Sequence, residues 1–104
     1  MYRESKSFVI ASHPPVIRTR LDKARYRAGE TIRLRVSASA SARTIVARLY
    51  GAAPVDLRWN QQAGANTGEM SVPKLSPGKY QLTVIAEDVA HNIGSEEVAI
   101  EIIP

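Results

Sequence analysis

Apolar and polar residues alternate along this chain in short runs that recur about every ten residues. The clearest run spans residues 31–38, where every second residue from Ile32 is apolar and Arg33 and Arg35 fall between them. Side chains of a β-strand point alternately to its two faces, so this pattern predicts a strand with one face buried and one in water.

The same pattern predicts further strands, and residues rich in turn formers separate them. Tyr80, Leu82, Val84 and Ala86 alternate with polar residues, and Trp59 continues an alternating run, so we expect Trp59 in the core. No segment shows a helical period. The additional strands are expected at residues 16–21, 45–50, 55–59, 70–72, 80–87 and 98–103. The turns are expected at residues 28–30, 51–54, 63–68, 76–78 and 92–94.

About seven short strands without helices predict an all-β sandwich or barrel. A chain of 104 residues has room for one hydrophobic core but not for two. Phe8 and Ile10 fit one more possible strand, and the break at Pro14-Pro15 suits a sheet edge. We therefore expect an N-terminal linker or edge strand over residues 1–14 and one domain over residues 15–104.

Three motifs follow one another in the order found in one family. Leu75-Ser76-Pro77-Gly78-Lys79-Tyr80 resembles the L-x-P-x-x-Y corner of fibronectin type III and related immunoglobulin-like domains. Residues 86–92 resemble the A-x-D-x-x-G-N hairpin of bacterial Ig-like modules, with His91 where Gly is usual. Residues 28–32 resemble the entry to their second strand.

The resemblance implies an immunoglobulin-like sandwich of about seven antiparallel strands with Greek-key connections. It also implies that the Tyr80 hydroxyl bonds to backbone a few residues upstream, with Leu75 and Pro77 completing the corner. Such modules belong to exported or cell-surface proteins, so the implied location is extracellular, at the cell surface or periplasmic, within a longer chain.

Composition narrows the chemistry. The chain has no cysteine, which excludes disulfides and thiolate chemistry. No apolar stretch approaches the roughly 20 residues of a membrane-spanning helix. The run Phe8-Val9-Ile10-Ala11 is also too short for the centre of a secretion signal, so we expect a chain that is either not exported or cut from a longer precursor.

Catalysis and metal binding have few candidate residues. The two histidines, His13 and His91, lie in no nucleophile motif, so we expect no enzyme and no cofactor. Asp88 and Asn92 are a weak calcium candidate because their oxygens suit that ion. The alternative is that both side chains bond to the amides of their own turn, and it is favoured because no calcium-loop motif is present.

Basic residues are unevenly spread. Fourteen Lys and Arg against ten Asp and Glu give a net charge of +4. On paired first and second strands, arginines at even spacing would share an outer face that attracts anionic polysaccharide, lipid headgroups or phosphates. The alternative is a solvated face that improves solubility and discourages edge pairing. The candidates are Arg18, Arg20, Arg25, Arg27, Arg33 and Arg35.

Apolar residues on the other sheet suggest a second surface. If Ile45, Leu57, Leu82 and Ile100 face the core, several apolar neighbours must point outward and could contact another domain or chain. Single exposed apolar residues are also common, so both interpretations stay open. The outward residues are Val46, Tyr50, Ile85 and Ile103.

Two functions fit these features, and an enzymatic role would require a larger parent chain that supplies the active site. The first is a non-catalytic Ig-like module that acts as a spacer or binds an adjacent domain or another protein. The alternative is an accessory module that holds an anionic glycan or a membrane surface through its arginines. We expect no specific nucleic acid partner, because only Tyr26 is interleaved among the basic residues, whereas single-strand binders stack bases on a platform of aromatic side chains.

Overall fold

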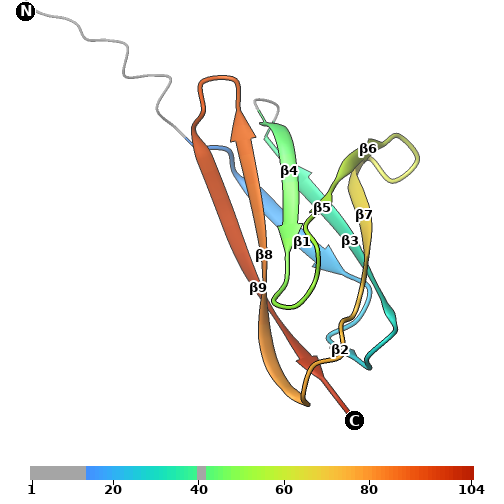
Figure 1. Ribbon diagram of the computed structural model, residues 1–104. Coiled ribbons are helices and arrows are strands. Elements are labelled where there is room, and N and C mark those ends of the chain that lie inside the picture. Colours follow the sequence, from blue (N-terminus) through green and yellow to red (C-terminus); the bar gives the residue numbers. More distant parts are fainter. Residues whose placement is uncertain (1–13, 40–41) are drawn as a thin grey trace, which may run out of the picture.

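The computed structural model describes residues 14–39 and 42–104 of the chain and contains only β-strands in that part (Figure 1). The strands form two hydrogen-bonded sheets. The four-stranded sheet has the order β1 (Ile17–Leu21), β3 (Thr31–Ala38), β7 (Ala65–Ser71), β6 (Arg58–Asn60). The five-stranded sheet has the order β2 (Arg25–Tyr26), β9 (Ile93–Ile102), β8 (Gly78–Asp88), β4 (Ala42–Arg48), β5 (Val55–Asp56). The described residues include no helix that is long and apolar enough to cross a membrane.

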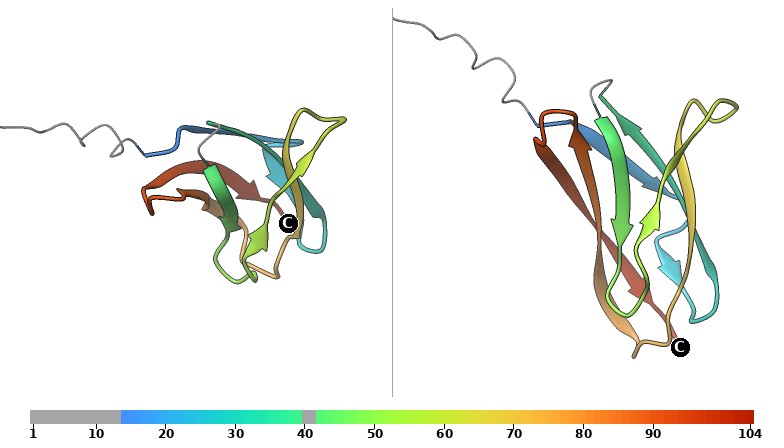
Figure 2. Two further views of the ribbon diagram at one scale, coloured as in Figure 1. Left: turned by 90° about the horizontal axis from the view of Figure 1, so that it is seen from above. Right: turned by 45° about the horizontal axis from the view of Figure 1, so that its top comes forward.

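Side chains from both sheets bury one shared core. In β3, Ile32, Leu34 and Val36 are buried whereas Arg33 and Arg35 are exposed, as the alternation predicts. Seen from above, the β8–β9 hairpin and β4 lie on one side of the molecule and β6 and β7 on the other (Figure 2). One of the sheets is curled into a half-barrel, so the two layers are not flat planes.

The strand predicted over residues 55–59 is in fact two strands in different sheets. Val55 pairs with β4 of the five-stranded sheet, whereas Arg58 pairs with β7 of the four-stranded sheet. Leu57 lies between them, is buried, and donates its N–H to the carbonyl oxygen of Ile45 at 2.9 Å. The chain therefore crosses from one sheet to the other at Leu57.

This crossing explains why the prediction of a buried Trp59 is wrong. Trp59 is 65% exposed. Its register partner Asn66 pairs in turn with buried Val36, so Trp59 lies on the inner side of its sheet. However, β6 is the edge strand, and the tryptophan lines an opening beside Ile45 and Leu57 instead of being covered.

The turn predicted at residues 63–68 is shorter than expected, because β7 already begins at Ala65. Gly64 has a φ of 64°, a left-handed value that suits glycine, and supplies the turn. Gly68 has a different role inside the strand. A Cβ atom there would lie 2.5 Å from Cδ2 of Leu57, so the missing side chain lets the crossing segment pack against β7.

The two sheets also meet along their edges near the start of the described chain. Glu96 of β9 faces inward opposite Val84, and its Oε1 accepts the N–H of Thr19 in β1 at 2.6 Å. A Cβ atom at Gly94 would collide with the carbonyl oxygen of Pro15. The edge of β1 is thus held against β9 by a carboxylate and a glycine.

One strand pairing is parallel, although only antiparallel strands were expected. β2 pairs with β9 through Arg25–Glu101 and Tyr26–Ile102, because the chain leaves β1 and joins the other sheet in the direction of β9. In the described residues there are nine strands, and β2 and β5 have only two residues each. The strand predicted at Phe8 and Ile10 lies outside the described residues, and so does His13.

Candidate functional site

The outer side of the four-stranded sheet presents a group of arginines that we call the arginine face. Its members are Arg18, Arg20, Arg33, Arg35 and Arg58, all exposed. Register brings three of them into one row across the sheet, since Arg20 pairs with Arg35, Arg35 with Thr67, and Thr67 with Arg58. Neighbouring strands lie about 5 Å apart, so this row is a continuous band of cationic and hydroxyl groups.

The structure brings together four of the six predicted arginines and separates the other two. Arg25 lies in β2 of the five-stranded sheet, where its Nε is 3.3 Å from Oε1 of Glu101. Arg27 follows β2 and donates its Nε–H to the carbonyl oxygen of Pro104 at 3.1 Å. The chain changes sheets after β1, so equal spacing in the sequence does not continue as one face.

Arg58 belongs to the arginine face but was not among the predicted residues. From the alternating run at residues 55–59 we expected Arg58 to point away from the core, but on the sheet that contains Ile45 and Leu82. Only the crossing at Leu57 brings it into register with Thr67. The sequence signal that could have suggested the crossing is Gly68, where a strand position without a side chain permits close approach of another segment.

The arginine face has little compensating negative charge. Its outward strand positions include five arginines and one acid, Glu69, a net charge of +4. Oε2 of Glu69 lies 3.5 Å from Nε of Arg33. Within residues 14–39 and 42–104, no acid forms an ion pair with Arg18, Arg20, Arg35 or Arg58.

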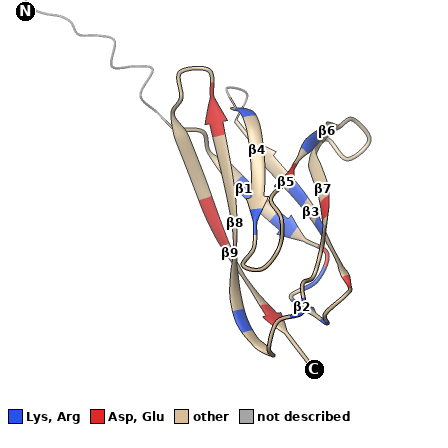
Figure 3. Ribbon diagram, viewed as in Figure 1, with Lys and Arg blue, Asp and Glu red and all other residues tan. Residues whose placement is uncertain are grey.

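The outer side of the five-stranded sheet is different, because basic and acidic residues alternate there. Its outward strand positions hold three bases, Arg25, Arg48 and Lys79, and four acids, Asp56, Glu87, Glu97 and Glu101. Figure 3 shows the contrast: β1, β3 and β6 carry basic segments, whereas β8 and β9 carry acidic ones as well. The positive charge is thus concentrated on one sheet.

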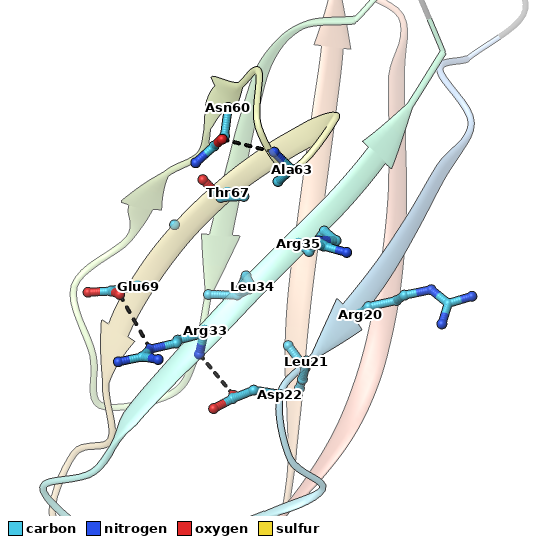
Figure 4. Close-up of a pocket in the computed structure, with 11 residues that line it drawn as sticks. Arg20, Leu21, Asp22, Arg33, Leu34, Arg35, Asn60, Ala63, Thr67 and Glu69 are labelled. Carbon is cyan, nitrogen blue, oxygen red and sulfur yellow. Dashed lines mark hydrogen bonds and ion pairs between the residues drawn. The ribbon is translucent and has the colours of Figure 1, made fainter.

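A depression of about 560 Å³ opens in the arginine face (Figure 4). Arg20 and Arg35 lie on one side of it, and Glu69 with Arg33 lies on the other. Thr67 and the hairpin residue Asn60 border its third side, and the Oδ1 atom of Asn60 accepts the N–H of Ala63 at 3.0 Å. The depression therefore combines guanidinium groups with carboxylate, hydroxyl and amide groups.

Asp22 borders this depression and is held by a buried tyrosine. The hydroxyl of Tyr26 donates to Oδ1 of Asp22 at 2.7 Å, and the backbone N–H of Arg33 donates to the same oxygen at 3.1 Å. Burial raises the pKa of Asp22, but these two hydrogen bonds, together with one from its own backbone N–H and the charge of Lys23, outweigh it, so the pKa lies below its ordinary value. Burial and the bond to Asp22 raise the pKa of Tyr26 to about 12.

Tyr26 is completely buried, and the sequence analysis did not single it out. Its hydroxyl also accepts the N–H of Lys23 at 3.0 Å, so it fixes the segment between β1 and β2. The sequence offered one signal for this bond. Tyr26 follows Asp22 by four residues, and Tyr80 follows its own hydrogen-bond partner by the same number. The hydroxyl of Tyr80 donates to the carbonyl oxygen of Ser76 at 2.7 Å.

That bond is of the type that the resemblance implies for the corner. Leu75 packs against the core and Pro77 is exposed in the segment before β8. Tyr80 itself is partly buried and packs against the core. These three residues fix the entry to β8 and lie outside the arginine face.

The four outward apolar residues do not form one patch. Val46 and Ile85 are register partners and both are half-buried. Tyr50 is 76% exposed but lies in the turn after β4, beyond the row of Arg48, Thr83 and Glu97. Ile103 follows β9 at the far end, where its N–H donates to the carbonyl oxygen of Tyr26.

The carboxylate of Asp88 is occupied by its own turn. Oδ1 accepts the N–H groups of Ala90 and Asn92, each at 2.9 Å, and Oδ2 accepts the Asn92 side-chain amide at 3.1 Å. Burial raises the pKa of Asp88, but these bonds, together with the nearby His91, outweigh it and hold the pKa below its ordinary value. His91 has a φ of 65° in the same turn, and its Nδ1 lies 2.7 Å from Oε2 of Glu87.

These hydrogen bonds favour the turn interpretation of Asp88 and Asn92. In the part of the chain that the structure describes, no group of three His, Asp or Glu side chains could hold a metal ion.

Comparisons with known proteins inform the fold only. No protein-family model matches this sequence, and no curated protein matches it. Four chains of known structure match. One is the crystal structure of an engineered protein, with a TM-score of 0.62 and 17% sequence identity over 90% of this chain. This chain spans about a fifth of the length of that protein, since the match covers 21% of it.

Proposed function

We propose that residues 15–104 form an immunoglobulin-like sandwich with Greek-key connections. In constant-type immunoglobulin domains the sheets contain strands A, B, E and D and strands C, F and G. The order β1-β3-β7-β6 corresponds to A-B-E-D, and the order β9-β8-β4 corresponds to G-F-C, which supports the assignment. The Tyr80 bond to Ser76 supports it independently.

We further propose that this domain is a non-catalytic module that binds an anionic polysaccharide through the arginine face. The observation that carries the proposal is the direct pairing of Arg20 with Arg35 on adjacent strands. Like charges that face each other across a strand pair are destabilising, so this arrangement opposes folding. An anionic ligand that bridges both guanidinium groups would neutralise the repulsion and form charge-assisted hydrogen bonds with both arginines.

Neighbouring groups favour a polysaccharide over other anionic partners. Uncharged hydrogen-bonding residues, Ser37, Thr67 and Asn60, are interspersed among the arginines and suit sugar hydroxyls. The outward strand positions of this sheet include no aromatic residue on which bases could stack, and no large apolar residue that could enter a membrane. A polysaccharide ligand also fits the cell-surface or periplasmic location that the resemblance implies.

The alternative function, a contact surface for an adjacent domain or another protein, stays a prediction. On the five-stranded sheet only Val46 and Ile85 lie together, and both are half-buried already. A role as a spacer is compatible with polysaccharide binding, because the arginine face occupies only one side of the domain.

Affinity measurements at two salt concentrations test the proposal. Polygalacturonate and heparin represent anionic polysaccharides, and dextran is the neutral control. We expect binding to an anionic polymer that weakens as salt rises, and no binding to dextran. Absence of binding to both anionic polymers, or binding that salt does not change, would refute the proposal. Equal binding to anionic lipid vesicles or to DNA would refute the assignment to polysaccharide.

A further inference from the structure

The depression in the arginine face differs from the rest of that face because it contains negative charge. Glu69 borders it at one side, paired with Arg33 at 3.5 Å, and Asp22 lies at the same end. The hydrogen bonds from Tyr26 and Arg33 to Asp22 both go to Oδ1, and Oδ2 takes part in neither of them. Arg20 and Arg35, on the opposite side, have no acid within ion-pair distance in the described residues.

We infer that this depression recognises a uronic acid unit, a sugar that carries one carboxylate and free hydroxyl groups. The inference rests on the proposed function and specifies its ligand class. A planar carboxylate matches the fork of a guanidinium group and can accept two parallel hydrogen bonds from it. Arg20 and Arg35 therefore take the carboxylate of the sugar.

The opposite side of the depression suits hydroxyl groups. A hydroxyl donates to a carboxylate, so Glu69 and Asp22 attract the hydroxyls of a sugar ring. Thr67 borders the depression from the row that contains Arg35 and Arg58, and its hydroxyl can both donate and accept. In a uronic acid the negative charge and the hydroxyl donors occupy different parts of one ring, as the basic and acidic groups do here.

Sulfated sugars fit the same depression poorly. When sulfate esters replace hydroxyl groups, negative charge also comes close to Glu69 and Asp22, where like charges repel each other. The same applies to a phosphate chain, which has no hydroxyl donor on its charged groups. The carboxylates thus select against densely sulfated polymers, while the arginines attract every anion.

The test compares a short oligogalacturonate with a sulfated dextran oligosaccharide of similar length and charge. The native domain should bind the oligogalacturonate about tenfold more tightly or better, the factor that one charge-assisted hydrogen bond provides. Glu69→Gln keeps an acceptor but removes the charge, so it should raise the affinity for the sulfated ligand and narrow the preference. Glu97→Gln on the five-stranded sheet, also an exposed glutamate, should change neither affinity.

The outcomes separate the two proposals. If both ligands bind equally well and Glu69→Gln changes nothing, the uronic acid inference fails while polysaccharide binding stands. If the sulfated ligand binds more tightly to the native domain, the inference fails in the same way. If neither ligand binds at low salt, the proposed function itself fails.

Discussion

The outer sides of the two sheets bear similar numbers of charged residues but arrange them in opposite ways. On the five-stranded sheet, bases and acids face each other across strand pairs, as Lys79 and Arg25 both do with Glu101. On the four-stranded sheet, Arg20 faces Arg35, and only Arg33 has an acidic partner in Glu69. Opposite charges across a strand pair favour folding and like charges oppose it. The charge pairs of the five-stranded sheet therefore stabilise the fold, whereas the Arg20–Arg35 pair of the four-stranded sheet destabilises it.

The largest expected effect comes from reversing charge on one sheet and then on the other. Arg20→Glu with Arg35→Glu should lower the affinity for polygalacturonate by about 100-fold or more, since two charge-assisted contacts are lost. Arg48→Glu with Lys79→Glu makes the same change in net charge on the five-stranded sheet and should lower the affinity by less than about threefold. Equal losses in the two variants would show that net charge, and not the arginine face, determines binding.

The next effect concerns the tyrosine that supports the depression from inside. Tyr26→Phe leaves the N–H of Lys23 without its acceptor and removes one bond from Asp22, so it should destabilise the domain by about 1–3 kcal/mol. Chemical denaturation followed by intrinsic fluorescence or circular dichroism measures this change. Ser76 accepts a similar bond from Tyr80, and Tyr80→Phe provides the comparison at a more exposed site.

The same variant should change how stability depends on pH. The Tyr26 pKa of about 12 lies above its ordinary value near 10, so its contribution is present below pH 10 and is lost as pH rises toward 12. The Asp22 pKa is lowered, so its contribution is present above the ordinary carboxyl pKa and is lost as pH falls. Tyr26→Phe should abolish the alkaline loss and weaken the acidic one. An unchanged alkaline loss would contradict the raised pKa of Tyr26, which burial and the bond to Asp22 produce together.

A smaller effect is expected from the apolar pair on the five-stranded sheet. Ile85→Ser should cost about 1 kcal/mol of stability, because Ile85 is half-buried against Val46. Adding Tyr50→Ser should change stability little, since that side chain is exposed. Affinity for polygalacturonate should stay within about twofold in both variants. A large loss of affinity would move the binding surface to this sheet.

The smallest expected effect is a gain in stability caused by a single substitution. Arg20→Glu alone replaces the repulsion with Arg35 by an attraction, so it should stabilise the domain by about 0.2–1 kcal/mol. The same substitution should weaken polysaccharide binding. A variant that gains stability and loses affinity indicates that the native arginine is retained for binding; a loss of stability would show that Arg20 has a structural role.

Strands with one buried face were predictable from the sequence, and so was part of the arginine face. β3 and β8 alternate strictly, and β1 and β3 pair as the first and second strands, which brings Arg18, Arg20, Arg33 and Arg35 to one side. Here the side-chain period and the pairing of neighbouring strands depend only on local residues and short connections.

Other features depend on contacts that no local pattern reveals. The run from Val55 to Trp59 alternates throughout, yet the chain changes sheets at Leu57, so Trp59 is exposed and Arg58 joins the arginine face. Arg25 and Arg27 leave that face because β2 pairs with β9, far away in the sequence. Asp22 and Glu69 border the depression only because β1, β3 and β7 align in register.

Chemical-shift mapping of the ¹⁵N-labelled domain, titrated with oligogalacturonate, locates the bound ligand without any substitution and so tests whether the arginine face binds it. We expect the perturbed amides to lie in β1, β3, β6 and β7, with the largest shifts around Arg20, Arg35 and Thr67. Shifts confined to β4, β8 and β9, or no shifts at a ligand concentration that saturates binding, would contradict it.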